Sequence, residues 1–206
     1  MGTRTPARIR AGHAACQAGA MRADESSEVL FIGGRAGVGK STVALEVSHL
    51  LALADVQHAV IEGDNLDHAY PAPWRQGLNL AERNLSAMWQ NYREAGYRRL
   101  IYTNTVSVLE TNALLAAIGG RARAVSVLLT ADDETARTSL AQREIGSALD
   151  EHVERSHRAA RELEAKAGPS VHRIRTDGRT ATDIAEEIIG IICWAGAGSG
   201  DTQSGH

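Results

Sequence analysis

The run FIGGRAGVGKST, residues 31–42, constrains the fold of this chain more than any other stretch. It contains the complete pattern G-x-x-x-x-G-K-[ST], after an apolar segment at 29–32 and before apolar residues at helical spacing over 40–54. Glycines let the backbone curl so that successive amides point inward, and the following helix directs its positive end at the same point. A tight glycine turn is the alternative. The full pattern in a strand–loop–helix context predicts a loop that binds the phosphates of a nucleoside triphosphate.

The residue types of this loop predict separate contacts with the nucleotide. Lys40 can reach the β- and γ-phosphates, the hydroxyl of Ser41 can ligate Mg²⁺, and Thr42 can contact the α-phosphate. The residues before the lysine are expected to supply backbone contacts, namely Gly34, Arg35, Ala36, Gly37, Val38 and Gly39. The expected cofactors are therefore ATP and Mg²⁺.

The rest of the chain predicts one α/β domain. Strand patterns occur at 29–32, 58–62, 99–103, 124–129 and 171–175, and helical patterns at 40–54, 80–95, 107–118, 132–144, 150–166 and 182–194. This alternation predicts a three-layer fold in which helices cover both faces of a five-stranded parallel sheet, with a helical lid. Ligands of such sheets bind at the carboxyl ends of the strands.

Composition limits the partners and the boundaries of this domain. The 206 residues carry a net charge of −3 and the basic residues are spread out, so no nucleic-acid partner is expected. The longest apolar run, 188–195, is too short to cross a bilayer, and the spacing of the two cysteines fits neither a metal nor a redox motif. We expect a cytoplasmic protein with a disordered extension at 1–27, a folded domain at 28–195 and a flexible tail at 196–206. The sequence does not indicate an oligomeric state.

With this loop and order of elements, the chain resembles the P-loop nucleoside and small-molecule kinases, a group that includes adenylate, shikimate, gluconate and adenylylsulfate kinases. In that group an acidic residue commonly follows the second strand and faces the γ-phosphate and the acceptor. Here the second strand ends in IEGDNLDHAYP, and its GDN is similar to that of adenylylsulfate kinases. The resemblance implies that Asp64 orients or deprotonates an acceptor hydroxyl or holds the metal, with Glu62 sharing the metal role. A polar turn is the alternative for both.

The segment after Asp64 is expected to cover the acceptor. Asp67, Arg75 and Arg83 are its candidate substrate contacts, since arginine can clamp an anion. For each of them an ordinary surface loop is the competing interpretation. Asn104 follows the third strand, where a Walker B motif would place an aspartate, and is a further substrate candidate. It cannot supply a charge, which places more demand on Asp64 and Glu62.

Two further sites follow from the resemblance. Many relatives carry two arginines on the helix after the fourth strand, and Arg143 stands at the second of these positions, where it would stabilise charge on the transferring phosphoryl group. The loop after the last strand often contacts the nucleotide base, which makes Asp177 and Gly178 candidate nucleotide contacts. Asp132 and Asp133 are expected to begin a helix, where acidic residues favour the helix dipole.

The function that these patterns favour is ATP-dependent transfer of a phosphoryl group to a small molecule. A GTPase is disfavoured because no N-K-x-D is present, and a transporter ATPase because the chain is short and lacks the Walker B acid. The chain is also similar to the tunicamycin-resistance ATP-binding proteins, so a protein that phosphorylates or sequesters an antibiotic is one alternative. An ATP-binding regulatory module without phosphoryl transfer is another.

Overall fold

The computed structural model describes residues 26–141 and 149–194. Its strands are β1 (Ser26–Gly33), β2 (Ala59–Glu62), β3 (Arg99–Thr103), β4 (Arg121–Thr130) and β5 (His172–Arg175). Its helices are α1 (Lys40–Leu53), α2 (Leu80–Glu94), α3 (Thr111–Ile118), α4 (Asp133–Ala141), α5 (Leu149–Lys166) and α6 (Ala181–Ile192). Two short 3₁₀ helices, η2 (Gly63–Asn65) and η3 (Pro73–Gln76), follow β2. The tail expected at 196–206 and nearly all of the extension expected at 1–27 lie outside the described residues.

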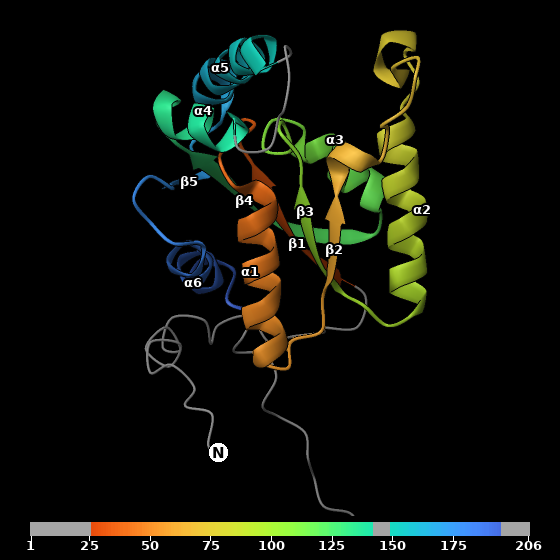
Figure 1. The fold of residues 1–206 in the computed structure, drawn as a ribbon. Coiled ribbons are helices and arrows are strands. Elements are labelled where there is room, and N and C mark those ends of the chain that lie inside the picture. Colours follow the sequence, from red (N-terminus) through yellow and green to blue (C-terminus); the bar gives the residue numbers. More distant parts are fainter. Residues whose placement is uncertain (1–25, 142–148, 195–206) are drawn as a thin grey trace, which may run out of the picture.

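The five strands form one parallel sheet in the order β2-β3-β1-β4-β5 (Figure 1). All carboxyl ends of the strands therefore lie at the same edge, where β1 continues into the glycine-rich loop in the middle of the sheet. Figure 1 shows α4 and α5 beyond this edge on the β4 side, and the 73–76 helix beyond it on the α2 side. The predicted five-stranded α/β fold is confirmed.

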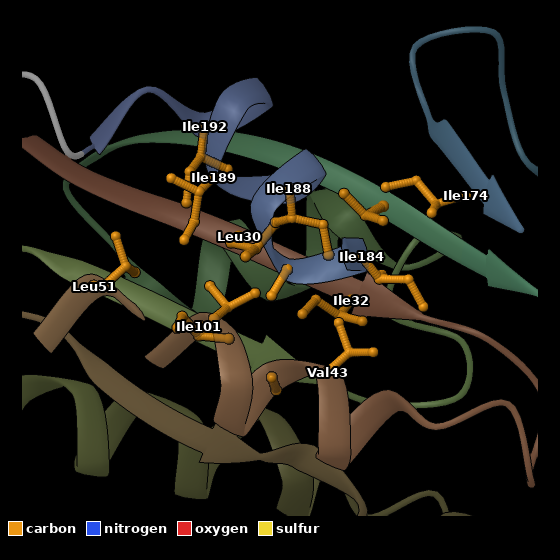
Figure 2. Close-up of a cluster of buried hydrophobic side chains, with 14 of the residues drawn as sticks. Leu30, Ile32, Val43, Leu51, Ile101, Ile174, Ile184, Ile188, Ile189 and Ile192 are labelled. Carbon is orange, nitrogen blue, oxygen red and sulfur yellow. The ribbon is translucent and has the colours of Figure 1, made fainter. Parts of the chain in front are cut away.

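One face of the sheet is covered by α1 and α6. Four isoleucines of α6 lie at helical spacing and point toward the strands, where they contact Leu30 and Ile32 of β1 (Figure 2). Burial of such aliphatic side chains contributes about 1.5–3 kcal/mol each, which makes this cluster a main source of stability. It also fixes α1 under the loop, since Val43 and Leu51 of α1 belong to the same cluster.

The opposite face is covered by α2 and α3. The core there includes Phe31 and Tyr102, whose rings meet edge to face with centroids 5.8 Å apart, and the fully buried Trp89 of α2. Leu114 of α3 completes the same layer. Met88, the residue before Trp89 on α2, is not part of this core and is 37% exposed. The helix turns Met88 about 100° away from Trp89, so only one of the two neighbours faces the sheet.

Two local predictions about helix ends were wrong. The helix expected from residue 107 begins at Thr111, because Asn104 and Val106 organise the preceding residues as a turn: the Asn104 Oδ1 atom accepts from the Val106 N–H at 2.9 Å. The last helix was expected from residue 182 and begins at Ala181. Its cap is Thr180, which forms a reciprocal capping box with Asp183.

The buried hydrogen bond between Trp89 and Ser27 gives a stability prediction. The indole Nε1–H donates to Ser27 Oγ at 3.2 Å, and both residues are buried. Ser27→Ala leaves this donor without its partner, so we expect the free energy of unfolding to fall by about 1–2 kcal/mol in urea denaturation. The exposed Ser170→Ala variant is the control. Equal midpoints for the two variants would show that the bond contributes nothing.

No helix within residues 26–141 and 149–194 is long and apolar enough to cross a membrane.

Candidate functional site

The glycine-rich loop has the backbone geometry that its sequence predicts. Gly34 and Gly37 have φ values of 148° and 84°, which side chains rarely adopt. A Cβ atom on Gly34 would stand 2.7 Å from the carbonyl oxygen of Leu129, and one on Gly37 would overlap the carbonyl oxygen of Ala136. The loop is therefore enclosed by β4 and α4, and glycine is needed at both positions for backbone reasons.

The predicted phosphate ligands lie at the positive end of α1. Lys40 is the first residue of the helix, and its Nζ donates to the carbonyl oxygens of Gly34 and Arg35 at 2.9 and 3.4 Å. Ser41 and Thr42 follow in the same turn. The lysine thus curls over the loop. An anion in the loop offers it a stronger, charge-assisted partner than these neutral carbonyls.

Arg35 directs its side chain away from the loop and into the helices beside it. The guanidinium is buried, with 3% of the residue exposed; its Nε donates to Ser156 Oγ of α5 at 3.0 Å, and its Nη1 pairs with Asp133 of α4. Ser156 Oγ in turn donates to the carbonyl oxygen of Ala36 at 2.9 Å. Arg35 therefore fastens α4 and α5 to the loop, and only its backbone remains a candidate phosphate contact.

The pairing with Arg35 holds the pKa of the Asp133 carboxyl below its ordinary value of 3.8, through a hydrogen bond and the charge of the guanidinium. Asp133 is also the first residue of α4, as expected of an acid that favours the helix dipole. A carboxyl with a lowered pKa in the folded state stabilises the protein above its unfolded pKa and loses that contribution as pH falls.

This shift predicts how stability depends on pH. Wild type should have a higher urea midpoint than Asp133→Asn at pH 6, and the difference should narrow below about pH 4 and vanish only below the lowered pKa. Because the Asp133 side chain is 68% exposed, the difference should be small. Glu134→Gln is the matched control on the same helix turn. A gap between wild type and Asp133→Asn that stayed constant to pH 2 would rule out a carboxylate–guanidinium origin.

Glu62 and Asp64 lie at the carboxyl end of β2, on the other side of the loop. The register pairs Glu62 with Thr103 of β3, and Thr103 with Ile32 of β1, so Glu62 stands level with a residue two positions before Gly34. Two strand spacings separate them, about 10 Å. Both carboxylates are exposed. The two carboxylates and the loop therefore lie at the same edge of the sheet.

A metal ion at this site would need phosphate oxygens of the nucleotide as additional ligands. Among the described residues, no three His, Cys, Asp or Glu side chains are arranged to hold a metal ion. The predicted ligands Ser41, Glu62 and Asp64 are oxygen donors, the type that Mg²⁺ prefers, and Mg²⁺ is usually bound by one or two carboxylates together with substrate phosphates. The donor set therefore fits Mg²⁺ bound with a nucleotide.

Asn104 lies in the turn after β3 and supports the glycine-rich loop through hydrogen bonds of this turn. Its N–H donates to the carbonyl oxygen of Ile32, its side-chain oxygen fixes the turn at Val106, and the neighbouring Thr105 carbonyl accepts from the Gly34 N–H at 3.1 Å. The residue that stands in place of a Walker B acid is thus used to shape the turn under the phosphate loop. A contact between Asn104 and the acceptor stays a prediction.

The segment expected to cover the acceptor is strongly exposed. Tyr70 and Trp74 are 99% and 63% exposed, and Arg75 and Arg83 are exposed as well. Arg83 lies two positions before the buried Leu85 and therefore projects from the opposite side of α2. Asp67 lies closer to the sheet edge, after the buried Leu66. The arginines do not reach the carboxylates of this region in any ion pair between described residues.

A cavity of about 220 Å³ lies between the end of β4, α5 and the segment after β5. Its charged lining consists of Arg35, Asp132, Glu164, Arg175 and Asp177. Arg175 pairs with Asp132 at 2.6 Å and with Asp177 at 2.8 Å, and Asp177 also accepts from the Asp132 N–H at 2.9 Å. Burial acts to raise the pKa of Asp177, but hydrogen bonds from Asp132, Thr135 and Arg175 outweigh it and lower the pKa. Asp177 lines this cavity and Gly178 follows it in the chain. Both residues are predicted contacts of the nucleotide base.

One predicted site residue lies outside the described residues, and several residues near the site were not predicted from the sequence. Arg143, the predicted catalytic arginine, lies outside the described residues. Sequence reasoning missed the role of Ser156, and it missed Tyr102, Glu82 and Glu110; the charges of the two glutamates act, like that of Asp64, on the Tyr102 hydroxyl. The only local signal for these two glutamates is their place in or just before the first turn of a helix, a common position for an acid.

Comparisons with known proteins place this fold. The sequence matches no family model and no curated protein. A tunicamycin resistance protein from Deinococcus radiodurans is 18% identical, with a TM-score of 0.54 over 81% of this chain and 95% of that one. A gluconokinase from Sinorhizobium meliloti 1021 is 15% identical, with a TM-score of 0.53 over 82% and 93%. A shikimate kinase from Acinetobacter baumannii, solved in complex with shikimate, is 13% identical, with a TM-score of 0.51 over 81% and 93%.

These likenesses cover 81–82% of this chain, while the low identities carry no information about the substrate. The chain therefore has the fold of the P-loop kinases.

Proposed function

We propose that this protein transfers the γ-phosphoryl group of ATP to a hydroxyl group of a small molecule, with Mg²⁺ bound to the nucleotide. The observation that carries the proposal is the arrangement at the sheet edge. A glycine loop with positive φ values lies in the middle of the carboxyl edge of the sheet, an exposed aspartate follows the strand two places away in that sheet, and two helices are fastened beside the loop. Small-molecule kinases among the structures of the same fold support it.

On the donor side, the loop amides and Lys40 are suited to bind and orient the phosphates. The helix N-terminus and the lysine are fixed donors that can stabilise charge where it develops during transfer. Mg²⁺ would be held by Ser41 with Asp64 or Glu62, and when bound it supplies charge neutralisation between the phosphate oxygens. Arg143 is proposed to add a second cation at the transferring group.

On the acceptor side, Asp64 is the group proposed to act. The acceptor oxygen forms a bond to the γ-phosphorus while the bond from that phosphorus to the β–γ bridging oxygen breaks, and ADP leaves with the electron pair. The hydroxyl proton passes to Asp64 or to water. A carboxylate is sufficient because such transfer requires positioning more than a strong base.

A screen of small-molecule acceptors tests the proposal. The full chain is incubated with ATP, Mg²⁺ and panels of sugars, amino sugars, nucleosides and amino alcohols, and ATP loss and product mass are measured. We expect one acceptor class to gain about 80 Da, the mass of one phosphoryl group. If ATP binds but no class of acceptor gains this mass, the kinase proposal fails.

A second candidate, binding of an antibiotic with or without its phosphorylation, is favoured by the similarity to a tunicamycin resistance protein. The same assay distinguishes the two. A sequestering protein should bind tunicamycin in the presence of ATP and leave its mass unchanged.

A further inference from the structure

Three acidic side chains lie above the α2–α3 face of the sheet, where their charges and that of Asp64 act on the hydroxyl of Tyr102. Glu82 precedes the buried Leu85 by three residues on α2, and Glu110, the N-cap residue just before α3, precedes the buried Leu114 by four residues. Residues at these spacings lie on the same helix face, one turn apart. Since Leu85 and Leu114 belong to one core cluster, the two carboxylates lie one turn above that cluster, toward the carboxyl edge of the sheet.

The third carboxylate, Asp67, lies on the segment after β2, and a side-chain hydrogen bond joins this segment to α2. Its neighbour Leu66 is buried in the same core cluster, and the Leu66 carbonyl oxygen accepts from Asn84 Nδ2 at 2.6 Å. Asn84 lies two residues after Glu82, in the first turns of α2. This bond joins the segment after β2 to the helix that carries Glu82. Asp67, Glu82 and Glu110, which we call the acidic triad, come from three segments that pack on one core cluster, and the charges of Asp67 and Glu82 both act on the Glu110 carboxyl.

The side chain of the buried Tyr102 lies next to the acidic triad. Tyr102 is 1% exposed, and a Cβ atom on Gly63 would overlap its hydroxyl oxygen, so the hydroxyl lies against the residue next to Asp64. This hydroxyl makes no hydrogen bond to another described residue, and its oxygen is not one of the fully enclosed side-chain atoms without a partner, which belong to Arg35 and His157, so it is open to the space in front of it. A ligand in that space would have this oxygen as a hydrogen-bond partner.

The charges around the triad are unbalanced. No ion pair between described residues involves a member of the triad or Asp64. Burial raises the pKa of the Glu110 carboxyl, and the negative charges of Glu82 and Asp67 raise it further. Burial also raises the pKa of the Tyr102 hydroxyl, and Asp64, Glu110, Asp67 and Glu82 add to the rise. All four carboxylates thus act on the same small region, which attracts a positive charge.

We propose that the acidic triad binds an ammonium group of the phosphoryl acceptor, so that the acceptor is an amine-bearing hydroxyl compound of the amino sugar or amino alcohol class. This inference rests on the proposed phosphoryl transfer. The three N–H groups of the ammonium donate to three of the acceptors offered by the triad and the Tyr102 oxygen, and a neighbouring hydroxyl group of the same molecule then faces Asp64. Recognition of the amine positions the hydroxyl for transfer.

An organic cation fits this region better than a bare metal ion. A metal needs several oxygen atoms within about 2.6 Å of one point. Among the described residues, which include the whole triad, no three acidic side chains are arranged in that way. An ammonium group is larger and can be shared by carboxylates that stand further apart, because each of its three hydrogens can serve a different acceptor.

The test compares amines with their acetylated forms. Glucosamine and ethanolamine, each beside its N-acetyl counterpart, are titrated into the full chain with a non-hydrolysable ATP analogue, and Kd is measured by calorimetry. We expect the free amines to bind at least about tenfold more tightly, with a difference that shrinks at high salt. Glu82→Gln and Glu110→Gln should each weaken the binding of the amine about five- to tenfold and leave the acetylated form unchanged.

Two further variants make the test specific. Glu94→Gln changes the same charge on the same helix, 12 residues and about 18 Å away from Glu82, and should change nothing. Tyr102→Phe should weaken the binding of the amine and leave the urea midpoint unchanged, because the hydroxyl has no partner in the described protein. The Glu→Gln variants should be at least as stable as wild type, since they remove repulsion.

The outcomes separate this inference from the proposed function. If no amine binds more tightly than its acetylated form, or if Glu82→Gln behaves as Glu94→Gln does, the cation site is wrong. Phosphorylation confined to neutral or anionic acceptors would leave the kinase proposal standing and overturn the cation site. Triad-dependent binding of amines in a protein that phosphorylates no acceptor would retain the cation site and overturn the kinase proposal.

Discussion

Replacing Gly37 with alanine is expected to lower the free energy of unfolding by about 2–5 kcal/mol and to remove nucleotide binding. A side chain at a φ of 84° costs about 1–2 kcal/mol in backbone strain. The new Cβ would also overlap the carbonyl oxygen of Ala136 and approach Leu140 Cγ to 3.1 Å, and such overpacking costs about 1–3 kcal/mol. The clash is with backbone, so α4 must shift or the loop must open.

Gly39→Ala is the matched control for this experiment. Gly39 has a similar φ of 91°, but nothing lies within 4 Å of the position that its Cβ would occupy. It should therefore lose only the strain contribution, about 1–2 kcal/mol. Urea denaturation of both variants isolates the contact between the loop and α4. Equal losses would show that α4 does not press on the loop in solution.

Lys40→Ala is expected to reduce ATP-dependent turnover about a hundred- to a thousandfold, the size of effect seen when a preorganised charge-stabilising donor is removed. In the structure its Nζ lies over the loop within 2.9 Å of the Gly34 carbonyl oxygen, so little reorganisation is needed when phosphate arrives. Turnover is measured with the acceptor identified by the screen. Lys166→Ala, which changes the only other lysine of the chain, exposed and paired with Glu162, is the control.

Asp64→Ala sharpens the interpretation of that result. A kinase should lose turnover in both variants, whereas Asp64→Ala should retain ATP binding because Asp64 lies on the acceptor side of the loop. Binding is measured with a fluorescent ATP analogue at fixed Mg²⁺. If Lys40→Ala turned over at the wild-type rate with ATP saturating, the loop would not serve the transfer step.

The parts that the sequence predicted correctly are those that local pattern controls. The sheet, the limits of α1 and α2 within a residue or two, and the loop between β1 and α1 all follow from apolar spacing and from glycines at fixed positions. Such signals need only neighbouring residues. The error in the start of α3 also has a local cause. The Asn104 side chain accepts a hydrogen bond from the Val106 N–H, and apolar spacing does not reveal this contact.

The site residues that escaped prediction are fixed by contacts between distant segments. The partner of Arg35, Ser156, is 121 residues away, so nothing in the loop indicates that this arginine points into α5 rather than at phosphate. The acidic triad is similar, since Asp67, Glu82 and Glu110 become neighbours only when β2, α2 and α3 pack on the sheet. Such groupings require the order of the strands and the faces of the helices, which the sequence pattern does not specify.

The burial of Arg35 has a consequence for the thermodynamics of nucleotide binding. Its backbone belongs to the loop while its side chain is bound to α4 and α5, so any change of loop conformation on binding must either carry both helices along or break their hydrogen bonds. The free energy of binding and the free energy of helix placement are then coupled, and the coupling is reciprocal. A substitution confined to the surface between α4 and α5, far from any phosphate, would change the affinity for ATP through this one side chain.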